Sequence, residues 1–152
     1  MDLQNPDHAR RKSDRLSQNA LAVLGRVIFS GVFLLSGFNN ILHFSQLSLE
    51  IADHTLIANA GLLLGLGILF QVGGGILVLL GLYTRIGALM LFMFMLTLTF
   101  LYHPFWMYNG TAQMMTQLQQ FMKNMVICGA ALYIVAFGGG RLSLDWLLLK
   151  KE

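Results

Sequence analysis

The feature that most constrains this chain is a succession of long apolar runs. Four such runs occupy residues 20–42, 59–82, 86–102 and 121–137. An α-helix needs about 17–25 predominantly apolar residues to cross a bilayer. Only 11% of the 152 residues are charged, whereas soluble domains carry about 25%. The sequence therefore predicts an all-α protein, a bundle of four transmembrane helices in a lipid bilayer.

The basic residues outside the apolar runs lie on one side of the predicted membrane. The loops 43–58 and 103–120 contain no lysine or arginine. The basic residues are found in the tail 1–19, in the turn near residue 85 and in the tail 138–152: Arg10, Arg11, Lys12, Arg15, Arg85, Arg141, Lys150 and Lys151. Positive residues favour the cytoplasmic side. We therefore expect both termini in the cytoplasm of a bacterial inner membrane, with the first run retained as an anchor because no cleavage site follows it.

Two segments between the runs are predicted to lie at the membrane surface. Residues 43–58 place Phe44, Leu47 and Ile51 on one side of a helix and Glu50 on another, which is typical of a short interfacial helix. In the tail 138–152, the sequence "GGGRLSLD" offers glycines that can end the fourth helix. After them, Ser143 and Asp145 can cap a short amphipathic helix. Arg141 could pair with Asp145 or bind lipid phosphates.

The second run has unusually many glycines and an amide at its centre. Gly67, Gly74 and Gly81 recur every seven residues, and Gln71 shares their face of the helix. Small residues allow helix backbones to approach closely within a membrane, and an amide can donate a hydrogen bond across such a contact. This face is therefore predicted to pack against other helices.

Four polar residues within the runs are predicted to converge in the bundle: Arg26, Gln71, Lys123 and Asn124. An unpaired amide in hydrocarbon costs several kcal/mol, so the polar faces should turn inward and meet. Two interpretations of this polar centre remain open. It can be a hydrogen-bonded plug that fixes the packing of the helices, or a pocket for a quinone. Either cation could instead extend its side chain to the lipid headgroups.

Histidines on the predicted outer side suggest a second hypothesis. His43, His54 and His103 fall in or beside the two loops that lack basic residues, with methionines nearby, and imidazole together with thioether suits copper. Single histidines at helix ends are more often simply interfacial. Cys128 is the only cysteine, which excludes thiol–disulfide exchange within the chain. The basic residues are not interleaved with aromatic residues, so nucleic acid is not expected as a partner.

The order of several motifs resembles the DoxX family of small four-helix membrane proteins over residues 21–146. The resemblance rests on "FQVGGGILVLLGLYTRIGA", on "FLYHPF", on the Lys123–Asn124 pair and on the Gly-Arg-x-Ser-x-Asp sequence that contains Arg141, Ser143 and Asp145. It implies a lysine where this chain has Asn40 and a glutamate where it has Gln71. Both intramembrane charges are therefore replaced by neutral amides here.

The resemblance implies an architecture more strongly than an activity, because one fold supports many functions. It favours a non-catalytic accessory or assembly subunit of an envelope redox or metal-handling system. The alternatives are a quinone-interacting subunit of an oxidoreductase, copper handling at the outer face, and transport. The expected partner is another membrane or envelope protein, or a second copy of the chain.

Overall fold

The computed structural model of this protein describes residues 6–54 and 59–149, with side chains described for residues 16–53 and 59–148. The helices are α1 (Pro6–Leu42), α2 (Phe44–His54), α3 (Ala60–Ile68), the π-helix η1 (Leu69–Gly73), α4 (Gly74–Leu80), α5 (Thr84–Tyr102), the 3-10 helix η2 (Phe105–Tyr108), α6 (Gln113–Phe137) and α7 (Leu144–Leu149). Four helical segments within the described residues are long and apolar enough to cross a membrane: Leu16–Leu42, Ala60–Leu80, Thr84–Tyr108 and Gln113–Phe137. The predicted all-α bundle with four spans is confirmed.

Two helices extend beyond the apolar runs that predicted them. α1 begins at Pro6, inside the expected basic tail, and α6 begins at Gln113, well before the apolar run at residue 121. Proline is well suited to the first turn of a helix, and glutamine is a good helix former. Hydropathy therefore marks only the membrane-embedded part of each helix, because polar helical turns are not apolar.

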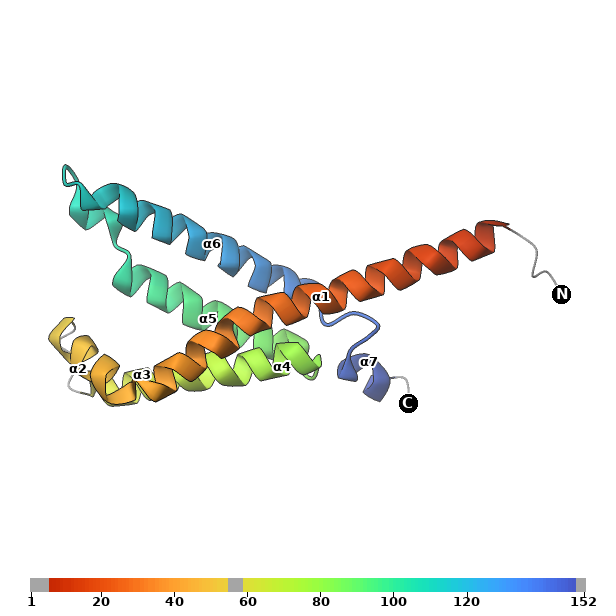
Figure 1. Ribbon diagram of the computed structural model, residues 1–152, viewed down its shortest axis with the longest axis horizontal. Helices are drawn as coiled ribbons and strands as arrows, with labels where there is room; N and C mark the ends of the chain where they lie inside the picture. Colours follow the sequence, from red (N-terminus) through yellow and green to blue (C-terminus); the bar gives the residue numbers. More distant parts are fainter. Residues whose placement is uncertain (1–5, 55–58, 150–152) are drawn as a thin grey trace.

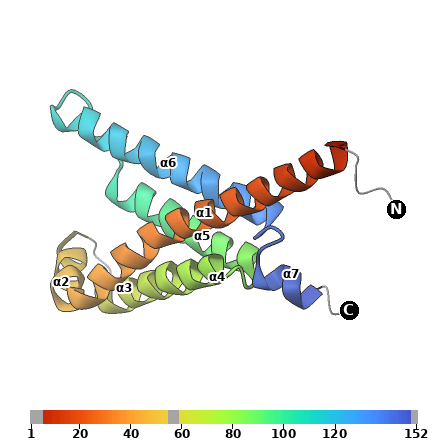
Figure 2. The same cartoon turned by 45° about the vertical axis from the view of Figure 1, so that its right-hand side comes forward.

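The long helices run side by side along the molecule (Figure 1). α5 packs against both α4 and α6, while α1 packs against η1 and α4. α1 and α6 diverge toward the end that carries α2, as the second view also shows (Figure 2). The predicted interfacial helix forms as α2, which packs on α3 through Ile51, Ala60 and Leu64; residues 55–58 lie outside the described part.

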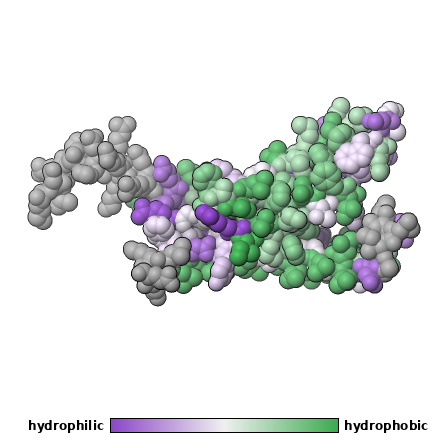
Figure 3. All heavy atoms as spheres, turned by 180° about the vertical axis from the view of Figure 1, so that it is seen from behind, coloured by the Kyte–Doolittle hydropathy of each residue, from purple (hydrophilic) through white to green (hydrophobic). Residues whose placement is uncertain are grey.

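The outside of the bundle is apolar, as a lipid-facing surface requires. Leu35 on α1 is 76% exposed and Val126 on α6 is 74% exposed. Hydrophobic residues cover much of the face seen in Figure 3, and hydrophilic ones gather mainly toward the two ends of the molecule. Inside, Phe33, Val78 and Leu91 form the core that joins α1, α4 and α5. The structure thus shows an integral membrane protein in which the helices bury few large side chains against each other.

The π-helix η1 interrupts the second span at its polar residue. Its five residues, Leu69–Gly73, contain Gln71, which is only 2% exposed. A π-turn adds a residue to the helix and so rotates the residues after it relative to those before it. Gly67 and Gly74 both face α5, as their seven-residue spacing predicts, but the side chain of Gln71 reaches α1. The prediction that Gln71 shares the face of these glycines is therefore wrong. Regular helical spacing could not reveal this rotation.

Among the three glycines spaced seven residues apart, Gly74 makes the close helix contact that the spacing predicts. A methyl group added at Gly74 would lie 2.8 Å from the carbonyl oxygen of Gly87, so α4 and α5 approach through their backbones. One added at Gly67 would lie 3.4 Å from the ring of Phe94 on α5. Gly81 has a different role, because it ends α4 with φ +68° in the left-handed region.

We predict that Gly74→Ala destabilises the bundle, because a methyl group there must push two backbones apart, at a cost of about 1–3 kcal/mol. The measurement is the thermal unfolding midpoint in detergent. Gly65→Ala is the matched control in the same span, since a methyl group at Gly65 meets no atom within 4 Å. Equal midpoints for the two variants would contradict the close contact between α4 and α5.

Candidate functional site

A cavity of about 300 Å³ lies between α1 and α6, and its lining combines apolar side chains with several polar ones. η1 and α5 also contribute to its wall. Its lining residues are Val32, Phe33, Ser36, Asn40, Gln71, Phe94, Met95, Leu98, His103, Gln120, Lys123 and Asn124. Three of the four residues predicted to converge, Gln71, Lys123 and Asn124, therefore meet around one space.

A hydrogen bond between two amides crosses from α1 to η1 beside this cavity. The Nδ2 group of Asn40 donates to Oε1 of Gln71 over 3.0 Å. The π-turn places Gln71 for this contact, and Gly37, one turn before Asn40, leaves room for Val72 and Gln71. Asn40 and Gln71 occupy the positions at which the family resemblance implies a lysine and a glutamate. Residue spacing alone did not identify Asn40 as a site residue. The family pattern, which has a lysine at this position, could have identified it.

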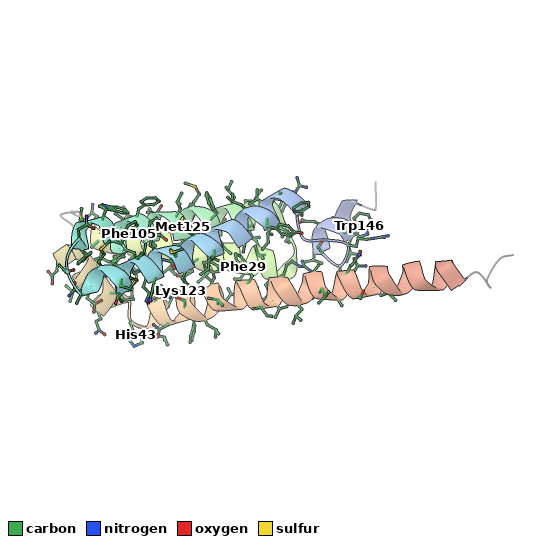
Figure 4. All side chains as sticks on the ribbon, turned by 90° about the horizontal axis from the view of Figure 1, so that it is seen from above. Phe29, His43, Phe105, Lys123, Met125 and Trp146 are labelled. Atoms are coloured by element: carbon green, nitrogen blue, oxygen red, sulfur yellow. The ribbon has the colours of Figure 1, made fainter. Side chains whose placement is uncertain are left out.

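The wall formed by α6 supplies an amide and an ammonium group. Asn124 is 5% exposed, and within the described residues its side chain has no hydrogen-bond partner. Lys123 lines the same cavity, and Figure 4 shows it on the side of α6 that faces α1. The Nε2 group of Gln71 likewise has no partner among the described side chains. The cavity therefore offers several hydrogen-bond donors to a ligand.

The predicted histidine cluster is not assembled in the described part of the chain. Nδ1 of His43 lies 2.9 Å from the carbonyl oxygen of Asn39 in its own helix. Nδ1 of His103 lies 2.8 Å from Oε1 of Gln117 and donates to it, because a carbonyl oxygen can only accept. The side chain of His54 lies outside the described residues. No group of three or more His, Cys, Asp or Glu side chains that could hold a metal ion is found among the residues described, so copper handling stays a prediction without geometric support.

Arg26 does not join the polar centre. It is 6% exposed, and its Nη2 group donates to the carbonyl oxygen of Leu142 in the C-terminal segment. Positions 26 and 40 are 14 residues apart, or about 21 Å along α1, and Asn40 is the residue that bonds to Gln71. The predicted convergence of Arg26 with Gln71 is therefore wrong. Counting residues from the start of the apolar run misjudged the depth of Arg26, because α1 continues far beyond that run.

Asp145 holds the C-terminal segment against the turn between α4 and α5. Its carboxylate accepts hydrogen bonds from the backbone N–H of Tyr83 at 2.6 Å, from that of Thr84 at 2.9 Å and from the Thr84 hydroxyl at 2.7 Å. Its own N–H donates to the carbonyl oxygen of Gly81. Burial alone would raise the pKa of Asp145, but the hydrogen bonds from Thr84 and Tyr83 and the positive charge of Arg26 hold that pKa below 3.8.

This contact corrects one part of the predicted tail and confirms another. Ser143 caps α7, since its hydroxyl oxygen accepts the N–H of Trp146 at 3.2 Å. Asp145 caps the start of α5 rather than α7, which satisfies backbone donors that the helix leaves free. The guanidinium of Arg141 lies 5.2 Å from the ring centre of Trp146, a cation–π contact. Of the two alternatives for Arg141, the contact differs from a pair with Asp145, and binding of lipid phosphates stays a prediction. Arg85 packs beside Gly138 at the same end of the bundle.

An apolar groove of about 700 Å³ adjoins the cavity between α2, α3 and α5. It shares Asn40, Phe94, Leu98 and His103 with the cavity lining. Most other residues that line it are aliphatic or aromatic. No sequence pattern predicts this groove, because it depends on how α2 folds back over α3.

We predict that Asp145→Ala lowers the free energy of unfolding by about 0.5–2 kcal/mol, the usual cost of losing a helix cap. The pKa of Asp145 is lower in the folded protein, so its contribution is present above about pH 3.8 and is lost as the pH falls through the folded-state pKa. Unfolding midpoints measured across this range should fall in the parent protein and change less in the variant. Asp53→Ala, which removes an exposed carboxylate on α2, is the control. An identical pH dependence in all three proteins would contradict this role.

Comparison with known proteins agrees with the architecture. The DoxX family model matches residues 21–104, so the motifs of α6 and the C-terminal segment lie beyond the matched part. Inner membrane protein YqjF of Escherichia coli (strain K12) is 40% identical over 91 residues, which is 60% of this chain. The match spans 65% of the length of that relative. No solved structure matches the chain. Because the family model covers more than half of its residues, this chain belongs to the DoxX family.

Proposed function

We propose that this chain is a non-catalytic membrane subunit of an envelope redox system and that its cavity binds the head group of a quinone. The observation that carries the proposal is the cavity itself, which gathers Gln71, Lys123 and Asn124 next to an apolar groove. Ligand sites are typically apolar hollows with a few well-placed polar groups. A plug that only fixed helix packing would fill this space with side chains.

The lining groups suit the carbonyl oxygens of a quinone. Nε2 of Gln71, Nδ2 of Asn124 and the ammonium of Lys123 are all donors, and none of them is used in another hydrogen bond to a described residue. Phe94 and Leu98 supply apolar contacts for the ring. A bound quinone would accept or release electrons; the lining side chains can orient it but do not deliver electrons. An electron-transferring partner protein is therefore part of the proposal.

An accessory role is favoured over metal handling because of the donor set. Ammonium groups and amide N–H groups do not ligate copper, whereas imidazole and thioether groups do. In the described residues, His43 and His103 are each engaged with an oxygen acceptor. The name of the relative states only that it is an inner membrane protein, which supports this location for the present chain.

The proposed orientation places both termini in the cytoplasm and the cavity in the outer half of the membrane. The distribution of basic residues supports it. Reporter fusions at residues 84 and 150 should therefore indicate the cytoplasm, and fusions at residues 50 and 110 the opposite side. A cytoplasmic signal at residue 110 would reverse the proposed orientation or remove one span.

We predict that the protein in lipid nanodiscs binds a long-chain quinone and that Asn124→Leu weakens binding at least about fivefold. A lost hydrogen bond contributes about 1 kcal/mol, and leucine has the same branched arrangement of heavy atoms as asparagine. The measurement is a titration followed by isothermal calorimetry, with empty nanodiscs subtracted. Gln119→Leu is the matched control on α6, because Gln119 is exposed and lies outside the cavity lining. Unchanged binding in Asn124→Leu, or no binding by the parent protein, would count against the quinone and leave an assembly role.

A further inference from the structure

We infer that the cavity and the apolar groove form one site for an amphiphile whose head group carries an oxyanion and whose single long chain lies in the groove. The inference rests on the proposed function and narrows its ligand to a chemical class. Two independent observations carry it: the charge of the cavity lining and the continuity of the groove with the cavity.

The cavity lining is positively charged and contains no aspartate or glutamate from the described residues. Asn40, Gln71 and Asn124 are neutral amides, so the Lys123 ammonium faces no carboxylate there. Lys123 is exposed and lies two residues after the start of the apolar run at residue 121, or about 3 Å along the helix axis. Its ammonium group lines the cavity, where an oxyanion on the ligand could pair with it. The attraction between the two charges is stronger beside an apolar groove than in bulk water.

The groove receives the chain of the same ligand because the two hollows share part of their walls. Asn40, Phe94, Leu98 and His103 line both. The groove of about 700 Å³ lies beneath α2 and is lined mainly by aliphatic and aromatic side chains. Its volume lies in the range usual for ligand sites. A ligand whose head group lies in the cavity can therefore extend its chain directly into the apolar groove.

The negative charge of Glu50 in the groove also determines the orientation of the ligand. Glu50 lines the groove together with Tyr102 and His103, and Glu50 does not line the cavity. A carboxylate repels an oxyanion, and the repulsion is stronger where water is scarce. The head group is therefore placed beside Lys123 and the chain beside Met93, Leu98 and Leu101.

The test uses pairs of probes that differ only in the charge of the head group. One pair is a long-chain hydroxynaphthoquinone, whose hydroxyl is acidic, and its neutral methyl ether. The second pair, dodecanoate and dodecanol, contains no quinone. Binding is measured on the full chain in zwitterionic nanodiscs. The parent protein should bind each anionic probe about tenfold to a hundredfold more tightly than its neutral partner, as a charge-assisted hydrogen bond provides.

Substitutions of Lys123 test whether its ammonium group causes the preference for the anionic probes. Lys123→Met should abolish the preference for the anionic probe in both pairs, and Lys123→Arg should retain it. Gln119→Met, which places the same side chain one turn earlier on α6, should leave it unchanged. The comparison of probe pairs in the parent protein tests the inference even where a variant folds poorly.

A second substitution tests the position of the chain. Thr97 is exposed and lines the groove but not the cavity. Thr97→Trp should weaken binding of the long-chain hydroxynaphthoquinone at least about tenfold. The tryptophan would occupy the groove, so the methylene groups of the ligand's chain could no longer be buried there. The same variant should leave binding of the chain-free hydroxynaphthoquinone unchanged, and Thr97→Val should behave like the parent protein.

The outcomes separate this inference from the proposed function. Equal binding of the anionic and neutral members of each pair would overturn the inferred oxyanion on the head group. The proposed function would still stand if the quinone bound. A Lys123-dependent preference for dodecanoate without any quinone binding would support the inference and overturn the proposed function. Equal loss of the chain-bearing and chain-free probes in Thr97→Trp would overturn the placement of the chain.

Discussion

The close approach of α4 and α5 at Gly74 and Gly87 is the contact on which the remaining arrangement depends. It brings two backbones together with no side chain between them, which requires glycine on both helices. α5 in turn carries α6 on its other side, and α4 continues from η1, which contacts α1. The positions of the cavity walls therefore follow from a contact that contains no polar side chain.

The two ends of the bundle are built differently. At the end that carries α7, Asp145, Thr84 and Arg26 close the structure through buried hydrogen bonds and opposite charges. At the other end α1 and α6 diverge (Figure 2), and amide groups line the space between them. Polar groups in a membrane are costly unless satisfied. The closed end satisfies Asp145 and Thr84 but leaves Nε and Nη1 of Arg26 buried without a hydrogen-bond partner among the described residues. The proposed ligand site is placed at the open end because Gln71, Lys123 and Asn124 line a cavity there.

The pair of Asn40 and Gln71 departs from the family pattern because both side chains are neutral. A hydrogen bond of 3.0 Å joins the two amides where the family resemblance implies two opposite charges. With both of those charges replaced, Lys123 becomes the cation that determines the electrostatic character of the cavity. A ligand that carries an oxyanion matches this lining better than a neutral one does.

Much of the architecture could be predicted from the sequence by itself. Apolar runs of sufficient length determined the four spans, and glycines at seven-residue spacing determined which face of the second span packs closely, because both properties belong to a single helix. Neighbouring helices decided the rest. The π-turn at Gln71, the distance of Arg26 from it and the capping of α5 by Asp145 depend on how far one helix is displaced along another. That displacement is set by contacts between residues remote in the chain, such as Asp145 with Thr84, and helical periodicity contains no information about it.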